Sequence, residues 1–483
     1  MNMQSTENNS PRAKANPLVA VAVYGLSILM LKGFSLLTIP LYASYLNPAE
    51  FGRLDIAVSL IEFTGLCAAL GLADTLYRFA ASGDSDQRRL AQAEIFGSGL
   101  LGASIIMVIA QLLASSIHAS FNMTIGVWPL RAGLFAAAIT GLIEMPLAWM
   151  RLNDRAFVYL SFITIRTLAQ IGISWFLLAS NYGAASILYA SLAVNIASTS
   201  VFATLASRAG GIRLTKTGTR NMANYGLPLV GGGLAMYALG TFDRLFLAQA
   251  VTAQDIGHYA IAAKLGLATA LFIQPLALYW FPKRIAVLDE PDGVARNAAV
   301  WGIGFSILIT GATFTTLIMP LFVRFGLPHA YAGALSYLPW LILASVMNEL
   351  VSLSSAGAYK RQAGYEILGV NSVAATVALV GYVALIPYFG VAGAILATLS
   401  AHGVRLSIFI LRSRAVAPVP LISLPSMAVA ISGIVPVLFD AHGVSPVVQA
   451  GYVVAGPLLV LSTAILTGMI RLPHRPHLAR GKA

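Results

Sequence analysis

Long apolar runs separated by short polar segments cover most of the chain. An α-helix needs about 20 apolar residues to cross the hydrocarbon core of a bilayer, and the runs reach that length. The first run, from Leu18 to about Ile39, is longer than a signal-peptide core and no A-x-A-like site closes it, so we assign it as a span. The pattern predicts an all-α polytopic membrane protein with about fourteen spans, near 18–41, 54–79, 94–115, 129–150, 157–180, 184–206, 225–249, 257–281, 298–320, 337–358, 366–387, 389–411, 419–438 and 448–470.

The basic residues give this arrangement a direction. With the N-terminus in the cytosol, most of the 30 Lys and Arg residues fall in cytosolic segments, and only Arg53, Arg131 and Arg324 fall in loops on the opposite side. Positive charge accumulates in cytosolic loops of membrane proteins, so this asymmetry predicts that both termini are cytosolic. It also favours an even number of spans.

Two halves of the sequence resemble each other. Residues 46–54 (LNPAEFGRL) align with 251–259 (VTAQDIGHY) at a shift of about 205, and 181–193 align with 388–400 at nearly the same shift. Glu144 and Glu349 occupy equivalent positions in the two copies, which favours a shared structural role. Charges present in both copies at span ends, such as Glu50 and Asp255, are expected to anchor helices or complement helix ends.

The repeat predicts a division of the chain into lobes. Two copies of six spans run in the same direction, so an axis along the membrane normal should relate them and leave a cleft between them. We predict a cytosolic N-terminal tail, an N-lobe with helices 1–6, a cytosolic linker, a C-lobe with helices 7–12, two added helices 13–14 and a cytosolic tail, over 1–17, 18–206, 207–224, 225–411, 412–470 and 471–483.

Composition supports the membrane assignment and excludes several functions. The chain is 58% hydrophobic and 10% charged, whereas soluble domains are about a quarter charged. The net charge of +12 lies in short segments between spans rather than in a basic domain, which argues against nucleic acid as a partner. A single cysteine, Cys67, leaves no cysteine-based metal cluster, and no H-E-x-x-H, Walker A or G-x-S-x-G motif is present. We expect no enzyme, no metal site and no cofactor.

Charges inside the spans are the candidate functional residues. Each costs about 2.5–3.5 kcal/mol on insertion scales, so each should face a wet cavity or a partner. Charges without a mate in the other copy are the better candidates. For a cationic, substrate-binding cavity we nominate the basic residues within spans: Lys32, Arg166, Arg244, Lys264 and Arg405. The alternatives are a buried ion pair for Lys32 and for Arg166, a structural role for Arg244 with Asp243, and snorkelling for Arg405.

Two acidic residues, Glu62 and Asp243, are candidates for a coupling ion, H+ or Na+. Glu62 has no mate in the other copy and no close basic neighbour in sequence. Asp243 adjoins Arg244, but successive helical residues point about 100° apart, so these two need not pair with each other.

Two segments carry a resemblance to a known family. YGLPLVGGGLAMYALGTFDRLFLAQAVTAQDIGHYAIAAKL (225–265) and GFSLLTIPLYASYLNPAEFGRLD (33–55) resemble the bacterial polysaccharide-biosynthesis membrane proteins, the lipid-linked oligosaccharide or O-antigen flippases of the MATE-like multidrug/oligosaccharidyl-lipid/polysaccharide exporter superfamily. The family's Asp-Arg pair maps onto Asp243 and Arg244. The resemblance implies a transporter of the bacterial inner membrane that flips an undecaprenyl-diphosphate-linked oligosaccharide by alternating access, for lipopolysaccharide or exopolysaccharide biosynthesis.

The implied partners are this lipid-linked oligosaccharide, membrane lipids and the glycan polymerase machinery. A cationic cavity suits a diphosphate, which Arg and Lys neutralise in a low-dielectric cleft. The alternative function is a MATE-like cation-coupled multidrug exporter, in which acidic residues should dominate the cavity. A membrane glycan polymerase or ligase is a third alternative, but it should carry a large outer catalytic loop that this chain lacks.

Overall fold

The computed structural model describes residues 17–79, 85–121, 123, 125–153, 155–209, 211–361, 364–440 and 445–470. These residues form α-helices, one π-helical turn and one 3-10 helix, and they contain no strand. The elements are α1 (Pro17–Tyr45), α2 (Pro48–Ala69), α3 (Leu72–Phe79), α4 (Ser85–Ser120), α5 (Val127–Leu152), α6 (Ala156–Ala179), α7 (Ala185–Ala209), α8 (Lys216–Asn221), η1 (Met222–Gly226), α9 (Leu227–Gly240), α10 (Asp243–Ala250), α11 (Ala253–Gly266), α12 (Thr269–Trp280), α13 (Arg284–Val287), α14 (Gly293–Gly326), η2 (His329–Ser336), α15 (Leu338–Ser354), α16 (Ala356–Arg361), α17 (Gly364–Phe389), α18 (Val391–Ser413), α19 (Leu424–Asp440) and α20 (Pro446–Leu466).

The all-α polytopic class is confirmed. Among the described residues, ten helices are long and apolar enough to cross a membrane, or eleven if the bent pair η2 and α15 forms one span. Helices occupy most of each of the fourteen predicted ranges. However, α9, α10 and α19 are shorter than a span and α1 is not among the ten, so the count of fourteen stays a prediction. The two tails, 1–16 and 471–483, lie outside the described residues.

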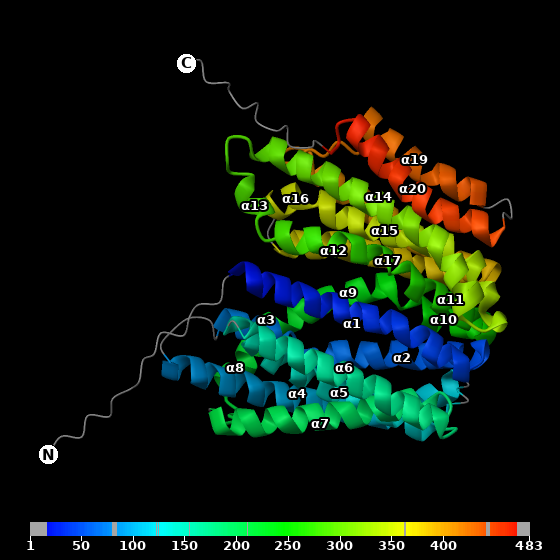
Figure 1. Cartoon of the computed structure of the whole chain (residues 1–483). Helices are drawn as coiled ribbons and strands as arrows, with labels where there is room; N and C mark the ends of the chain where they lie inside the picture. The colour runs from blue at the N-terminus through cyan, green and yellow to red at the C-terminus, as the bar shows by residue number, and fades with distance from the viewer. Residues whose placement is uncertain are drawn as a thin grey trace, which may run out of the picture.

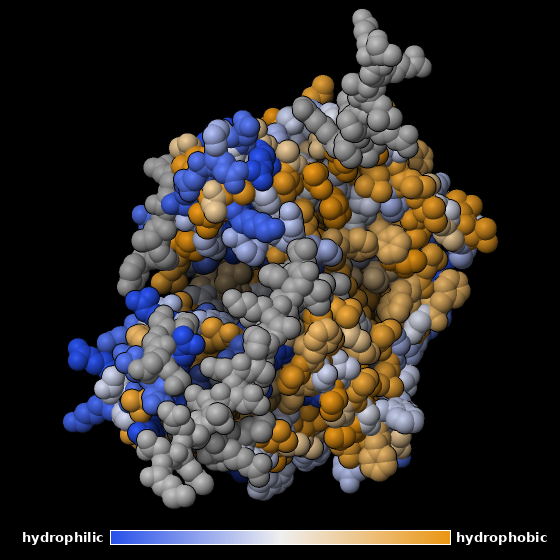
Figure 2. All heavy atoms as spheres, turned by 60° about the vertical axis from the view of Figure 1, so that its left-hand side comes forward, coloured by the Kyte–Doolittle hydropathy of each residue, from blue (hydrophilic) through white to orange (hydrophobic). Residues whose placement is uncertain are grey.

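The helices form two bundles (Figure 1). In the first, α5 packs on α2, α4 and α7, while α6 packs on α1 and α7. In the second, α18 packs on α15 and α17, and α14 packs on α15 and on the added pair α19 and α20. The short helices α3, α8, α13 and α16 lie at one end of the bundles, the α8 end, and α10 lies at the other, the α10 end (Figure 1). Figure 2, which brings the α8 end forward, shows hydrophilic residues gathered there beside a largely hydrophobic flank.

Equivalent caps start the two helices that meet between the bundles. Before α2, the Asn47 side chain accepts a hydrogen bond from the backbone N–H of Glu50 at 2.9 Å, and the Glu50 carboxylate accepts one from the backbone N–H of Asn47 at 2.9 Å. Before α11, Thr252 Oγ1 accepts a hydrogen bond from the Asp255 N–H at 3.2 Å and donates one to the Asp255 carboxylate at 2.6 Å. The predicted helix-end role of Glu50 and Asp255 is therefore confirmed. Such caps satisfy backbone donors that have no partner within the helix.

The bundles touch most closely where α2 crosses α11. A Cβ atom built on Gly52 would lie 1.9 Å from the carbonyl oxygen of Ala253, and one built on Gly257 would lie 1.9 Å from that of Pro48. Only glycine permits this approach, because any side chain would collide with the facing backbone. Gly52 and Gly257 are equivalent positions at a shift of 205. Close by, Tyr331 Oη donates a hydrogen bond to the Leu46 carbonyl at 2.8 Å. The crossing holds the bundles together toward the α10 end (Figure 1).

Candidate functional site

A buried cluster of charges joins the two bundles beside this crossing. Asp55 of α2 accepts hydrogen bonds at 2.8 Å from Lys264 Nζ of α11 and at 3.2 Å from Arg244 Nε of α10. Asp55 is 4% exposed and Arg244 is 8% exposed, so solvent screens this pair little. The Lys264 side chain is 36% exposed. One carboxylate of the first bundle thus holds two cations of the second.

Arg244 is also bonded to its neighbour in sequence. Its Nη1 atom donates to Asp243 Oδ1 and to the Gly240 carbonyl, each at 2.8 Å, and its backbone N–H donates to Asp243 Oδ1 at 2.8 Å. The hydroxyl of Tyr259 donates to the other Asp243 oxygen. The sequence left open whether Asp243 and Arg244 pair, and in the structure they do. Both lie in the first turn of α10, and the long Arg244 side chain reaches back to the Asp243 carboxylate and to the carbonyl of Gly240, where α9 ends.

Asp55 was missed by the sequence analysis, although a signal for it existed. It lies in the first turn of the predicted span 54–79, and its equivalent at a shift of 205 is Ala260. It is therefore an unmatched charge inside a span, like the residues that were nominated. Its position near a span end concealed it, because side chains near an end can reach water.

A cavity of about 220 Å³, the C-lobe cavity, adjoins this cluster in the second bundle. Its lining includes Asp243, Arg244, Tyr259, Ser345, Asn348, Glu349, Thr398 and His402. Arg405 does not line the cavity itself but bonds with a lining residue, and it is 8% exposed. Its Nε atom donates to Asn371 Oδ1 at 2.9 Å and its Nη1 atom donates to Asn348 Oδ1 at 3.0 Å. Burial and two amide partners make snorkelling the wrong interpretation of Arg405.

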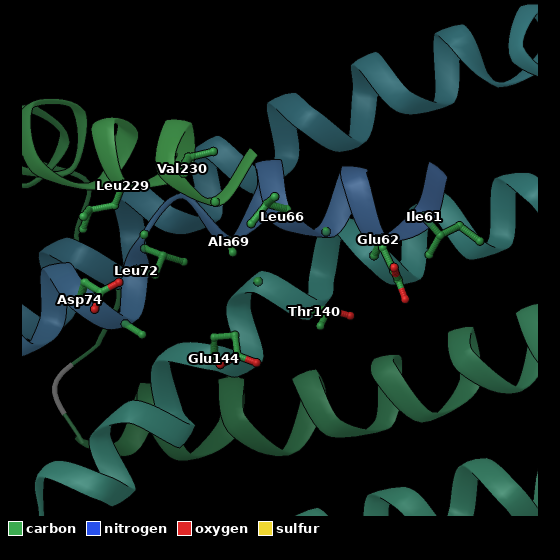
Figure 3. A pocket seen from close by; sticks show the side chains of 16 residues that line it. Ile61, Glu62, Leu66, Ala69, Leu72, Asp74, Thr140, Glu144, Leu229 and Val230 are labelled. Carbon is green, nitrogen blue, oxygen red and sulfur yellow. The ribbon is translucent and has the colours of Figure 1, made fainter. Parts of the chain in front are cut away.

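A larger cavity of about 610 Å³, the N-lobe cavity, lies in the first bundle against α9. Three carboxylates, Glu62, Asp74 and Glu144, belong to its lining, and no basic residue is among the lining residues that the structure describes. Figure 3 shows Glu62 on α2, with Thr140 and Glu144 on the neighbouring stretch of α5. The prediction of a cationic cavity does not fit this one. Glu62 is exposed to the cavity, as a coupling-ion candidate must be.

The two cavities occupy equivalent places in the two bundles. At a shift of 205, Thr140 and Glu144 of the N-lobe cavity correspond to Ser345 and Glu349 of the C-lobe cavity. The recurrence of glutamate at 144 and 349, first interpreted as structural, thus places one carboxylate in each cavity.

The nominated basic residues do not share one cavity. Arg244 and Lys264 meet at Asp55, and Arg405 supports the lining of the C-lobe cavity. Arg166 lies in the first bundle, where its Nη2 atom donates to Asn195 Oδ1 at 2.8 Å. The side chain of Lys32 lies outside the described residues. Among the described residues, no group of three or more His, Cys, Asp or Glu side chains is arranged to hold a metal ion.

Comparison with known proteins agrees with this architecture. The fold is similar to that of the lipid II flippase MurJ in an inward closed conformation, with a TM-score of 0.73 and 11% identity over 91% of this chain and 98% of that one. It is also similar to a multidrug-resistance MATE family transporter of the MOP superfamily, inward-facing (TM-score 0.59, 14% identity, 82% of this chain and 98% of that one) and outward-facing (0.54, 16%, 83% and 96%). These identities establish the fold alone.

No curated protein matches the sequence. The model of the polysaccharide biosynthesis protein family, however, matches residues 42–325, more than half of the chain. This stretch includes α2, α10 and α11, which carry the charge cluster between the bundles. The predicted resemblance is confirmed, and the chain belongs to the polysaccharide biosynthesis protein family, with the fold of the MATE-like exporters.

Proposed function

We propose that the chain is a flippase of the bacterial inner membrane for an undecaprenyl-diphosphate-linked oligosaccharide. Fourteen spans, both termini in the cytosol and two six-helix lobes, 18–206 and 225–411, are part of this proposal. In it the bundles are the lobes and the α10 end faces outward. The lobes rock about their contact, so that the space between them opens to one side of the membrane at a time.

One observation carries the proposal: Arg244 and Lys264 are held between the bundles by the single carboxylate of Asp55. A diphosphate arriving between the lobes has the charge and the acceptor oxygens to replace that carboxylate as their partner. Binding of the substrate then weakens the contact between α2 and the α10–α11 segment, which is the contact that must open outward. Arg244 and Lys264 therefore both recognise the charge of the substrate and, on binding it, release the contact between the lobes.

Deletion of the gene tests this function. The lipid-linked glycan should accumulate in the inner leaflet, and the surface polysaccharide should be lost. Arg244→Gln and Lys264→Gln should each fail to restore it, whereas Lys360→Gln, which removes a cation at the α8 end that pairs with Asp289, should restore it. Normal surface glycan in the deletion strain would contradict the proposal.

The N-lobe cavity favours a second candidate, a cation-coupled multidrug exporter. The described part of its lining has three carboxylates and no basic side chain, which suits a cationic drug. In that case deletion should leave the glycan intact and increase sensitivity to cationic dyes. Within the flippase proposal, the same cavity supplies Glu62 as the site where H+ or Na+ binds to drive the cycle. Asp243, the other candidate, is occupied by Arg244 and Tyr259.

A further inference from the structure

The polar lining of the C-lobe cavity exceeds what recognition of a diphosphate requires. His402 of α18 lines the cavity and is 6% exposed, and its Nδ1 atom is buried without a hydrogen-bond partner among the described residues. A buried polar atom left in that state costs free energy, so it calls for an explanation. A ligand bound in the cavity explains this unpaired atom and also explains why polar side chains surround it.

Arg405 fixes the orientation of a second group in the lining. Asn348 Oδ1 accepts the hydrogen bond from Arg405 Nη1 at 3.0 Å. The amide nitrogen of Asn348, with its two hydrogens, is then the end left to bond with a ligand. Arg405 is held in turn by Asn371 at 2.9 Å, so a buried network presets the amide before a ligand arrives.

The lining as a whole combines donors and acceptors on a small scale. An imidazole, an amide, the hydroxyl of Ser345 and the carboxylate of Glu349 surround about 220 Å³, equal to about seven water molecules at ~30 Å³ each. That space suits one sugar ring and far exceeds a single ion. Sugar hydroxyls both donate and accept hydrogen bonds, so mixed polar groups recognise them better than groups of a single charge.

The place of the cavity relative to the cations supports the same ligand. Arg244, which bonds with Asp55 at the interface, is itself part of the cavity lining. In a diphosphate-linked glycan, the first sugar is bonded directly to the distal phosphate. A phosphate on Arg244 therefore leaves that sugar at the cavity. The N-lobe cavity lacks the amide, because the equivalent of Asn348 is the buried Ile143.

We infer that the C-lobe cavity binds the first sugar ring of the lipid-linked glycan, with His402, Asn348 and Ser345 as the groups that recognise its hydroxyls. This inference rests on the proposed flippase function. In this inference the second lobe recognises the sugar of the glycan, and the cations between the lobes recognise the diphosphate that is common to all such lipids.

Binding to the purified full chain in nanodiscs tests the inference. The probes are undecaprenyl diphosphate without a sugar and the lipid-linked glycan extracted from a strain that lacks the protein. We expect the wild type to bind the glycan form at least tenfold more tightly, equal to about 1.4 kcal/mol. His402→Phe, which keeps an aromatic ring but removes its polar atoms, and Ser345→Leu, which fills the cavity, should lose that preference and keep the affinity for undecaprenyl diphosphate. Thr376→Val, at an exposed position on α17, is the matched control and should keep both.

The outcomes separate this inference from the proposed function. If the wild type binds neither lipid, or if Arg244→Gln leaves binding of undecaprenyl diphosphate intact, the flippase proposal fails. If the wild type binds both lipids equally, or both cavity variants still prefer the glycan form, the flippase proposal stands and the sugar site is wrong. If His402→Phe changes only the pH dependence of transport, His402 carries a proton and the sugar site is again wrong.

Discussion

Asp55→Asn is the sharpest test of the contact between the bundles. The substitution keeps the shape of the side chain but removes the charge that holds Arg244 and Lys264. Loss of one partner from a buried ion pair costs about 3–5 kcal/mol. Because the Lys264 side chain is 36% exposed, water compensates part of its loss, and Arg244 keeps its bonds with Asp243 and Gly240. We therefore take the lower value, about 3 kcal/mol.

The lost interaction energy destabilises the closed contact between the bundles, because Asp55 belongs to one bundle and both cations belong to the other. Each 1.4 kcal/mol is a tenfold change in an equilibrium constant, so about 3 kcal/mol shifts the equilibrium toward separation by roughly a hundredfold. Gly52 and Gly257 are unchanged in the variant, so the closed crossing can still form. A larger fraction of the molecules should therefore have the bundles separated at the α10 end, and the helices should stay folded.

Double electron–electron resonance measures this separation as the distance between two spin labels. Labels on Ser180→Cys, just after α6, and Phe325→Cys, near the end of α14, lie on different bundles, and Cys67→Ser removes the native thiol. Asp55→Asn should add a longer distance, whereas Asp289→Asn should not. Asp289 also bonds with a lysine, but its side chain is 72% exposed and it lies at the α8 end. An unchanged distance distribution in Asp55→Asn would show that the ion pairs do not hold the contact.

Three further predictions concern other parts of the chain. Gly52→Ala should abolish transport while the protein still reaches the membrane, because the new Cβ atom meets the Ala253 carbonyl; Gly231→Ala, with nothing within 4 Å, should transport normally, and activity in Gly52→Ala would refute the steric argument. Glu62→Gln should remove the dependence of transport on an H+ or Na+ gradient, and a retained dependence would exclude Glu62 as the coupling site. Asn47→Ala should destabilise the protein by about 1 kcal/mol through loss of the helix cap, measured as a lower thermal midpoint; an unchanged midpoint would contradict the energetic role of the cap.

Local and periodic features were predictable from the sequence. The helices follow from apolar runs, and the capping role of Glu50 and Asp255 follows from their recurrence at span ends. The family follows from two segments that the family model covers at least in part. These features depend on residues close together in the chain or on a fixed shift between copies.

The partners of the charges were not predictable. Asp55 and Lys264 are 209 residues apart, and no local pattern indicates which carboxylate reaches which cation. The pairing of Asp243 with Arg244 depends on the direction in which the long guanidinium side chain folds, which the spacing of the two residues does not indicate. The presence of two separate cavities, one in each bundle, likewise depends on how the helices pack, because small residues and side-chain direction decide where space remains.

The crossing at Gly52 and Gly257 has the form of an isologous dimer interface, in which one surface patch meets its own copy across a two-fold axis. On the proposed division into lobes, an ancestral six-helix unit would have made this contact with a second identical molecule. Within a single chain each copy can change independently of the other. The ion pair of Asp55 with Lys264 is such a difference, because the equivalent positions, Ala260 and Ser59, carry no charge. A homodimer would carry this pair twice, so its single occurrence makes the contact between the bundles asymmetric.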